Sequence, residues 1–573
     1  MPSKKATRER LDPTATQARD PRPLMLIGLF ALLLVGVCAL IWATERPPID
    51  DWGNIGIEGF KYRTKHNHAS MGVLALVTAV AVVVYFVLSR RDSLRRKRWW
   101  RPLTIAVPLA LVVVATLLYF YGSRVSKLHY PWFHDSYHYF LGAKYFPELG
   151  YAGLYECHLL ADSQRPNRRF APTDPVTDLR DDVRSVVWKT EARADCGGFT
   201  RERWGEFHRD LTFFDLNTRK EILTDRGYNG SPLHTVIATR IANFGAVTYE
   251  RLLALTFVDI AGILAMFAAI AWAFGWRIGC LFALFFMVNF ADRFNFVGAS
   301  FLRYLWMIAL GTGVAMMKKG RYGVAAVLMT AAAMLHVFPL LFFAGIGVKI
   351  VSDLVARRGL RPEYRTFVVW AVIATLVLGF VSLAPPSGID TYGDFLSAIS
   401  KHSRALTNMR VGFQYDFLFR GEIMASDPPY AYDDKAAELQ QLRPLYYPIV
   451  AVIAILGLLV ARRLDDVSAT VLAGVLLFFL LFGTVTYYYA VVALLVLLWH
   501  EQAETPAALL FPAVLFALTA VIFWLWYLTD NNLKFLNNTA MSAMLTIYLG
   551  ALLAHYVNRY RAELLPWRDG SRL

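Results

Sequence analysis

Residues 71–121 read MGVLALVTAVAVVVYFVLSRRDSLRRKRWWRPLTIAVPLALVVVATLLYFY, two apolar runs separated by a short basic segment. Each run is long enough to cross a bilayer, which takes about 20 apolar residues in a helix. The segment between them carries one acidic residue, Asp92, and seven basic ones: Arg90, Arg91, Arg95, Arg96, Lys97, Arg98 and Arg101. Because short cytoplasmic loops are enriched in Lys and Arg, we expect this loop inside the cell and the chain after residue 121 outside.

The composition agrees with many such spans. Of the 573 residues, 56% are hydrophobic and 18% are charged, which is too apolar for a soluble protein of this length. The net charge of +15 comes from Lys and Arg in short segments between apolar runs, so it indicates membrane orientation and not nucleic-acid binding. The sequence therefore predicts an all-α, multi-pass membrane protein that contacts membrane lipids and no nucleic acid.

Working outward, we expect about fourteen membrane segments with both chain ends in the cytoplasm. They lie at 24–44, 71–88, 102–121, 252–274, 277–290, 298–317, a short pair within 322–350, 366–384, 446–462, 468–484, 487–500, 507–528 and 540–558. The expected order is a basic cytoplasmic tail (1–23), two N-terminal helices (24–101), a core (102–384) with a large outer loop (123–250), a second outer loop (385–445), and C-terminal helices with a basic tail (446–573). No internal repeat, typical of many transporters, is evident.

The apolar run 322–350 does not fit a single crossing, because the basic segment that follows would then lie outside. The break His336-Val337-Phe338-Pro339 offers a solution, since proline interrupts a helix. Two helices of about 14 residues, roughly 20 Å each, then rise and return, and His336 lies at their recessed junction. The alternative is that Pro339 only kinks one helix and His336 is a packing residue.

The large outer loop shows less regular patterning. We expect a short surface helix at 137–154, a second one at 233–244, and a small irregular subdomain at 158–232 between them. Cys157 and Cys196 both lie in this loop and can form a disulfide if it faces an oxidising compartment, whereas Cys38 and Cys280 lie in apolar spans.

Residues 129–140, HYPWFHDSYHYF, concentrate ionisable and aromatic side chains just beyond a span. Asp135 is an isolated carboxylate among aromatic rings, where partial burial can tune it for use as a base. His134 and His138 would share one face of a helix, and they suit a phosphate or an acceptor hydroxyl better than a metal.

An aromatic belt at the membrane surface is the competing explanation for the rings. It accounts for Trp132 and Tyr139, and it is the preferred explanation for the run of three tyrosines at 487–489. It accounts poorly for Asp135.

Further charged residues near the outer face are candidates. Asp292 stands beside Arg293, so a local ion pair is the alternative to a catalytic role. Asp259 and Arg303 lie in apolar spans, where charge is costly, and pairing with each other would explain both. The second outer loop adds a cationic cluster that suits a lipid-linked phosphate or is simply solvated: Lys401, His402, Arg404 and Arg410.

Taken together, residues 102–500 resemble the GT-C superfamily of membrane glycosyltransferases, which use polyprenyl-phosphate sugars on the extracytoplasmic side. In that superfamily the first outer loop carries an acidic residue that serves as the catalytic base, followed by surface helices, and Asp135 matches this position. Ala291-Asp292-Arg293 matches a second acidic motif. The break at His336 looks like a Lys-x-Pro or Arg-x-x-Pro break with the cation replaced, and the stretches 301–339 and 401–412 are similar to those of bacterial proteins related to the polyprenyl-phosphate-mannose group.

The resemblance implies an inverting transfer of a sugar from a polyprenyl-phosphate donor to a lipid, glycan or protein acceptor. Asp135 would act as the base, and the cationic residues Arg303, His336, Lys401, His402, Arg404 and Arg410 would hold the donor phosphate. Because Asp135 lacks the usual DxD or paired acidic residue, we expect neither a metal nor another cofactor, and two extra spans precede the core. We expect the protein in a bacterial cytoplasmic membrane. A transporter or flippase of a lipid-linked or anionic substrate is the alternative, and a binding or assembly protein is a third possibility.

Overall fold

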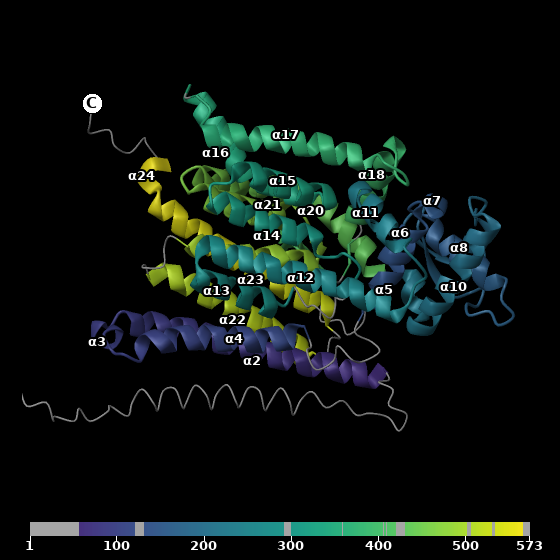
Figure 1. Ribbon diagram of the computed structural model, residues 1–573, viewed down its shortest axis with the longest axis horizontal. Coiled ribbons are helices and arrows are strands. Elements are labelled where there is room, and N and C mark those ends of the chain that lie inside the picture. The colour runs from purple at the N-terminus through teal and green to yellow at the C-terminus, as the bar shows by residue number, and fades with distance from the viewer. Residues whose placement is uncertain are drawn as a thin grey trace, which may run out of the picture.

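The computed structural model describes residues 57–120, 131–291, 300–357, 359–404, 406–407, 409–419, 430–500, 506–529 and 533–564. Figure 1 shows a bundle of helices that run side by side, with a smaller domain at one end. Eight helices in the described part are long and apolar enough to cross a membrane, and five further apolar helices are shorter. A mostly helical membrane protein is therefore confirmed, while the total of about fourteen segments stays a prediction. The tail 1–23 and the expected span 24–44 lie outside the described residues.

The described part of the bundle consists of eight long apolar segments and five shorter ones. Seven long helices are α2 (Ile57–Ser89), α4 (Trp100–Tyr119), α12 (Tyr249–Phe274), α17 (Pro362–Ser382), α20 (Tyr430–Ala461), α22 (Pro506–Leu528) and α23 (Lys534–Arg559). The eighth apolar segment joins the 3₁₀ helix η3 (Phe338–Phe342) to α16 (Phe343–Val355). The shorter ones are α13 (Trp276–Val288), α14 (Leu305–Lys318), α15 (Tyr322–Leu335), α21 (Asp466–Leu481) and the 3₁₀ helix η4 (Thr486–Trp499). Two short helices, α3 (Asp92–Arg95) and α24 (Arg561–Leu564), follow α2 and α23.

Apolar side chains form one core that runs through the bundle from α2 to α23. The innermost elements are α21 and η4, most of whose residues are buried, whereas α2 packs along α22 and α17 lies at the edge. The outer face of α17 leaves Leu376 and Phe380 more than two-thirds exposed. Such a face suits lipid and not water, because large contiguous apolar surfaces are rare on soluble monomers.

The run 322–350 folds back on itself, as the rise-and-return prediction requires. The hydroxyl of Tyr322, at the start of α15, donates to Asp466 at 2.5 Å, and Lys349, at the middle of α16, donates to the same carboxylate at 2.7 Å. Tyr364, in the first turn of α17, donates to it at 2.9 Å. The middle of α16 therefore lies close to the start of α15, which requires the chain to turn back at Pro339 and rules out a single kinked helix.

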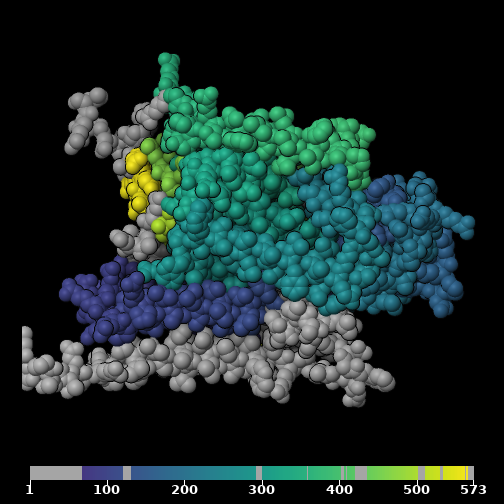
Figure 2. Space-filling view, viewed as in Figure 1, coloured from purple at the N-terminus to yellow at the C-terminus, as the bar shows by residue number. Residues whose placement is uncertain are grey.

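The smaller domain contains most of the large outer loop (Figure 2). Its elements are α5 (Phe133–Ser136), the π-helical turn η1 (Tyr137–Leu141), α6 (Gly142–Lys144), α7 (Phe146–Leu149), α8 (Gly153–Ser163), β1 (Pro175–Asp178), β2 (Val183–Val186), α9 (Val187–Ala192), α10 (Arg201–Asn217), the 3₁₀ helix η2 (Lys220–Thr224) and α11 (Pro232–Ala242). Strands β1 and β2 pair antiparallel, with Pro175 opposite Val186. The domain has its own aromatic core, which includes Phe140, Tyr145, Tyr155, Phe207 and Phe214.

The expectation of one surface helix at 137–154 was wrong. This stretch is broken into η1, α6 and α7, and Gly150 ends α7 with a left-handed φ of 55° that favours glycine. Its aromatic rings face the domain core and not a membrane surface, because Tyr137 and Tyr145 are fully buried. The second expected helix, 233–244, is present as α11.

The second outer loop is tied to the bundle by a small sheet. It contains α18 (Ile389–Arg404), β3 (Arg410–Val411) and α19 (Phe413–Leu418), and β3 pairs antiparallel with β4 (Thr484–Val485) just before η4. Two short strand pairs therefore modify the all-α prediction. Strands of two to four residues are too short to show a period-2 pattern in sequence.

Cys157 and Cys196 form a disulfide between α8 and the loop before α10. The pairing that the sequence left open is therefore present in the structure.

We expect a thiol reagent applied to the unfolded but unreduced protein to label only Cys38 and Cys280. After reduction all four cysteines should react, which intact-mass measurement will count. Labelling of all four without reductant, in protein taken directly from its membrane, would contradict the pairing.

Candidate functional site

Asp135 lies where the domain meets the bundle. Its side chain is 17% exposed and sits on the single turn α5, at the start of the domain. Ser300 Oγ donates a hydrogen bond to Asp135 Oδ2 at 3.2 Å, and Arg303 Nε lies 3.7 Å from the same oxygen. The carboxylate is thus partly open to solvent and paired with a cation from the segment that leads into α14.

Arg303 is buried, with a side chain only 4% exposed. Its Nη2 donates to the hydroxyl of Tyr487 on η4, and its guanidinium carbon lies 4.3 Å above the ring of Tyr139 and 4.5 Å from the ring of Tyr487. Within the described part of the chain, Nε and Nη1 have no hydrogen-bond acceptor. A buried guanidinium with two unsatisfied donors is costly. A bound anion would satisfy such donors.

Asp259 on α12 supports Arg303 in a way that the sequence did not predict. Its Oδ2 accepts the backbone N–H of Arg303 at 3.3 Å, while the guanidinium turns toward Asp135 and Tyr487. The expected pairing of these two charged residues thus runs through the main chain, and Asp259 fixes the backbone from which the Arg303 side chain extends.

His336 lies at the junction of α15 and η3, half-buried among aromatic rings. Its ring centroid is 5.6 Å from that of Trp306 and 5.3 Å from that of Tyr488, and Tyr488 lies 6.0 Å from the Arg303 guanidinium. Its Nδ1 is buried without a hydrogen-bond partner among the described residues. The ring is packed among aromatic residues, as expected of a packing residue. It also has a polar atom without a described partner, as expected of a site residue at the junction.

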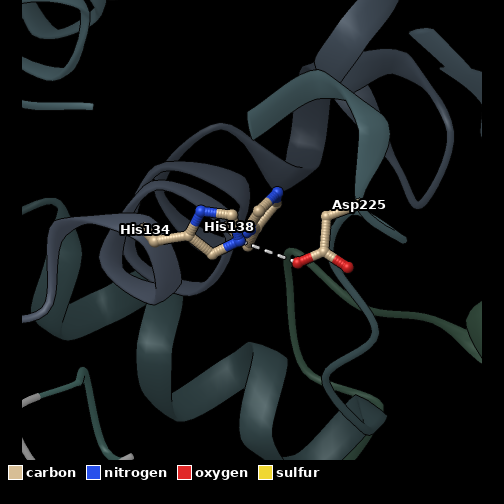
Figure 3. Close-up of side chains that lie close together, drawn as sticks. All are labelled: His134, His138 and Asp225. Atoms are coloured by element: carbon tan, nitrogen blue, oxygen red, sulfur yellow. Dashed lines mark hydrogen bonds and ion pairs between the residues drawn. The ribbon is translucent and has the colours of Figure 1, made fainter. Parts of the chain in front are cut away.

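A cluster of His134, His138 and Asp225 adjoins Asp135 (Figure 3). His134 Nε2 lies 2.9 Å from Asp225 Oδ2, His138 Nε2 is hydrogen-bonded to Tyr155 Oη at 2.8 Å, and the two imidazole centroids are 5.0 Å apart. Burial alone would lower the pKa of His134, but its hydrogen bond and ion pair with Asp225 raise it above the ordinary value. Burial lowers the pKa of His138 to about 4, so this ring is neutral near pH 7.

Asp225 remains negatively charged because the two imidazoles stabilise its carboxylate. Its partial burial would raise the pKa of the carboxyl group, but the hydrogen bond from His134 and the nearby imidazoles hold that pKa below the usual range. Sequence reasoning missed this residue, which is 91 positions beyond His134 and follows η2 in a polar loop. No local pattern distinguishes it from the other carboxylates of the domain.

Two of the four side chains of the predicted cationic cluster in the second outer loop are described, and they lie in different surroundings. Lys401 is exposed and donates to the carbonyl oxygen of Arg180, in the turn between β1 and β2. Arg410 is buried in β3, where Nη1 donates to Gly483 O at 3.1 Å. The side chains of His402 and Arg404 lie outside the described part, as does the whole of Asp292.

Aromatic residues that were expected in a membrane belt have other roles. Tyr139 and Tyr487 contact the Arg303 guanidinium, and the hydroxyl of Tyr489 donates to Val411 O at 2.9 Å. Their positions at span ends gave the belt signal, but their ring faces and hydroxyls are used for buried polar contacts.

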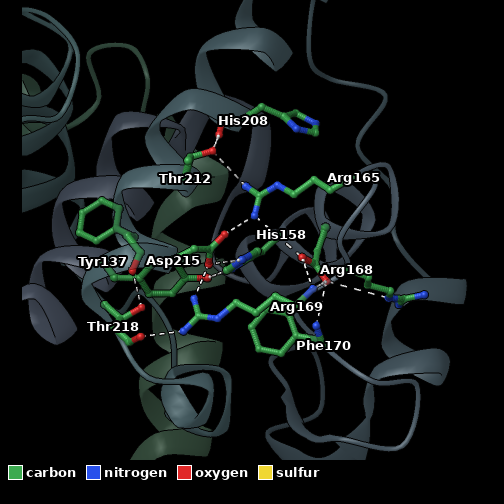
Figure 4. Close-up of polar contacts among 12 residues, drawn as sticks. Tyr137, His158, Arg165, Arg168, Arg169, Phe170, His208, Thr212, Asp215 and Thr218 are labelled. Atoms are coloured by element: carbon green, nitrogen blue, oxygen red, sulfur yellow. Dashed lines mark hydrogen bonds and ion pairs between the residues drawn. The ribbon is translucent and has the colours of Figure 1, made fainter. Parts of the chain in front are cut away.

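A buried ionic network holds the α5–η1 segment from the domain side (Figure 4). Tyr137 Oη is hydrogen-bonded to His158 Nδ1 at 2.7 Å, and His158 Nε2 lies 3.1 Å from Asp215 Oδ1. Asp215 on α10 also pairs with Arg165 and Arg169. These contacts join η1, α8 and α10 and hold the pKa of Asp215 below its usual range despite its burial.

Comparison with known protein families, with curated proteins and with solved structures found no match for this chain. A functional assignment therefore depends on the site and on the resemblance of its motifs.

We expect Asp215→Asn to destabilise the domain by about 2 kcal/mol, because His158, Arg165 and Arg169 would lose their common anion. This loss of stability is smaller than the cost of breaking a fully buried ion pair, because the side chains of Arg165 and Arg169 are each about one-fifth exposed. Thermal unfolding of the full-length protein measures the effect. Glu202→Gln, an exposed change on the same helix α10, is the control, and equal melting temperatures for the two variants would contradict a stabilising network.

Proposed function

We propose that this protein is a membrane glycosyltransferase of the GT-C kind. It moves a sugar from a polyprenyl-phosphate donor to a hydroxyl group of a lipid, glycan or protein acceptor on the extracytoplasmic face. The observation that carries the proposal is the pairing of Asp135 with Arg303: a partly exposed carboxylate lies beside a buried guanidinium that has unsatisfied donors. One group suits a proton acceptor and the other suits a phosphate.

The proposed reaction is a displacement at the anomeric carbon with inversion. Asp135 removes the proton from the acceptor hydroxyl as its oxygen bonds to the anomeric carbon, and the bond from that carbon to the donor phosphate oxygen breaks. The polyprenyl phosphate leaves with the electron pair. Its new negative charge needs stabilisation by donors that are in place before the reaction begins.

Arg303 is suited to that second task because its three nitrogens face different partners. Nε lies toward Asp135 and Nη2 donates to Tyr487, which leaves Nη1 for a phosphate oxygen. The aromatic rings of Tyr139 and Tyr487 hold the guanidinium plane, so little reorganisation is required during the reaction. His336 adds a polar nitrogen nearby, and Arg410 adds positive charge from the η4 side.

The remaining features support the same proposal. The apolar outer face of α17 can contact a lipid tail, and the disulfide supports an extracytoplasmic domain. With the basic 90–101 loop in the cytoplasm, both chain ends would lie there too, as in a bacterial cytoplasmic-membrane enzyme.

We expect Asp135→Asn to lower sugar transfer by about 10²- to 10⁴-fold, the usual contribution of a positioned base. Donor binding should change little, because Asn retains the shape and can accept the Ser300 hydrogen bond. The assay follows consumption of labelled polyprenyl-phosphate sugars, tested as a panel of hexoses and pentoses with the wild-type protein. Glu202→Gln serves as the matched carboxylate-to-amide control on the surface. Unchanged turnover in Asp135→Asn would overturn the assignment of the base, and substrate flipping by that variant in liposomes would favour a transporter.

Arg303→Lys tests the phosphate role separately. Lysine keeps the charge but loses the planar set of donors and its fit between the two tyrosine rings. We expect kcat to fall by about 10²- to 10³-fold, the loss typical for one donor to a developing anion. Arg209→Lys, an exposed change on α10, should leave turnover unaltered. A variant that lowers only protein stability and not turnover of the folded fraction would contradict the role.

A further inference from the structure

We propose that His134, His138 and Asp225 form a binding site for a divalent transition-metal ion of the Zn²⁺ type. The ligand atoms of these three side chains lie within 4.8 Å of one another. This proposal is independent of the proposed glycosyltransferase activity, because it concerns metal binding and not turnover. The sequence favoured a phosphate or a hydroxyl for the two histidines, and Asp225 supplies a third donor that was not visible from the local pattern.

The donor set is chemically suited to such an ion. Two imidazole nitrogens and one carboxylate oxygen make a set of borderline ligands that Zn²⁺ and neighbouring metals bind well, whereas Mg²⁺ and Ca²⁺ prefer oxygen alone. Three protein ligands leave at least one coordination position for water or another oxygen ligand.

The chain places the ligands from two directions. His134 and His138 are four residues apart on the continuous helical segment α5–η1, which puts their rings on one face. Asp225 follows η2 and approaches that face from the opposite side, as Figure 3 shows.

One ligand is fixed and the other two can adjust. His138 is buried, and its ring is held by the Tyr155 hydroxyl, which also accepts the backbone N–H of Gly227 at 3.2 Å and donates to Ile222 O at 3.1 Å. The side chains of His134 and Asp225 are 38% and 46% exposed. An ion can therefore enter from solvent on their side, and supporting hydrogen bonds orient the buried ligand as metal sites require.

The distances require only a small closure. In a tetrahedral site with bonds of about 2.1 Å, ligand atoms lie about 3.4 Å apart. The ligand atoms of His134 and Asp225 are already 2.9 Å apart. The remaining movement is between these two atoms and the ligand atom of His138, which lies within 4.8 Å of both. Rotation of the two exposed side chains can bring the set together around an ion.

The charges around the cluster favour a cation. Asp225 carries one negative charge, and Asp135 lies near enough for its charge to act on both imidazoles. Arg219 opposes this effect at His134, while the guanidinium of Arg226 is paired with Asp182. An ion pair explains the contact between His134 and Asp225, and the Tyr155 hydrogen bond explains the orientation of His138. A metal ion would bind to all three side chains together.

The test is metal binding by the purified full-length protein without an affinity tag. After treatment with EDTA, the protein is titrated with Zn²⁺ by calorimetry and with Co²⁺ by visible absorption, which reports low-symmetry coordination by nitrogen and oxygen. We expect one tight site per chain. Asp225→Asn and His134→Ala should each weaken it by more than the roughly 10- to 100-fold that loss of a supporting hydrogen bond costs a metal site.

Two further variants keep the result decisive. Asp225→Glu retains the carboxylate and should keep measurable Zn²⁺ and Co²⁺ binding, whereas His208→Ala removes a half-exposed histidine of the same domain and should leave binding unchanged. Melting temperatures confirm that each variant is folded, and His134 and Asp225 are exposed enough for substitution to be tolerated. The proposal is overturned if the wild type binds no Zn²⁺ at micromolar concentration, or if Asp225→Asn and His134→Ala bind it as the wild type does.

Discussion

The guanidinium of Arg303 is buried where the domain meets the bundle, and the arrangement of both parts depends on accommodating that charge. Removing such a group from water costs several kcal/mol unless anions, hydrogen-bond acceptors and aromatic faces replace the solvent. The replacements come from segments far apart in the chain: Asp135 and Tyr139 from the domain, Asp259 from α12 and Tyr487 from η4. Because each contact has its own geometry, together they set how the domain sits on the bundle.

Features that depend on local sequence were predicted well. Apolar runs gave the approximate positions of the apolar helices in the described part of the bundle. The balance of basic residues required the run 322–350 to return, which the contacts of Tyr322 and Lys349 with Asp466 confirm. Both predictions work because hydropathy and charge act within one helix and its flanks. Asp135 also stood out locally, as a lone carboxylate among rings, although its role as a base remains a proposal.

Features that depend on tertiary contacts were not predictable from one sequence. Asp225 and Ser300 have no distinguishing neighbours, yet folding brings each next to a residue that did stand out, His134 or Asp135. The belt explanation of Tyr139 and Tyr487 was wrong for a related reason: the aromatic signal at a span end is the same whether the ring faces lipid or covers a buried cation. Lys401 and Arg410, the two members of the predicted cationic cluster whose side chains are described, are close in sequence but have different partners.

Polar contacts on either side of the α15–α16 pair show how a few polar residues can order an apolar bundle. Apolar helices can slide past one another at little cost, whereas buried polar contacts have one satisfactory register. At one end, Asp466 collects Tyr322, Lys349 and Tyr364 from three different helices. At the other end, His336 packs against Trp306 and Tyr488, and the ring of Tyr488 lies 6.0 Å from the Arg303 guanidinium. The Asp466 contacts hold α15 and α16 together on one side, and the aromatic contacts of His336 hold their junction on the other. Both sets of contacts therefore help to position the candidate phosphate site.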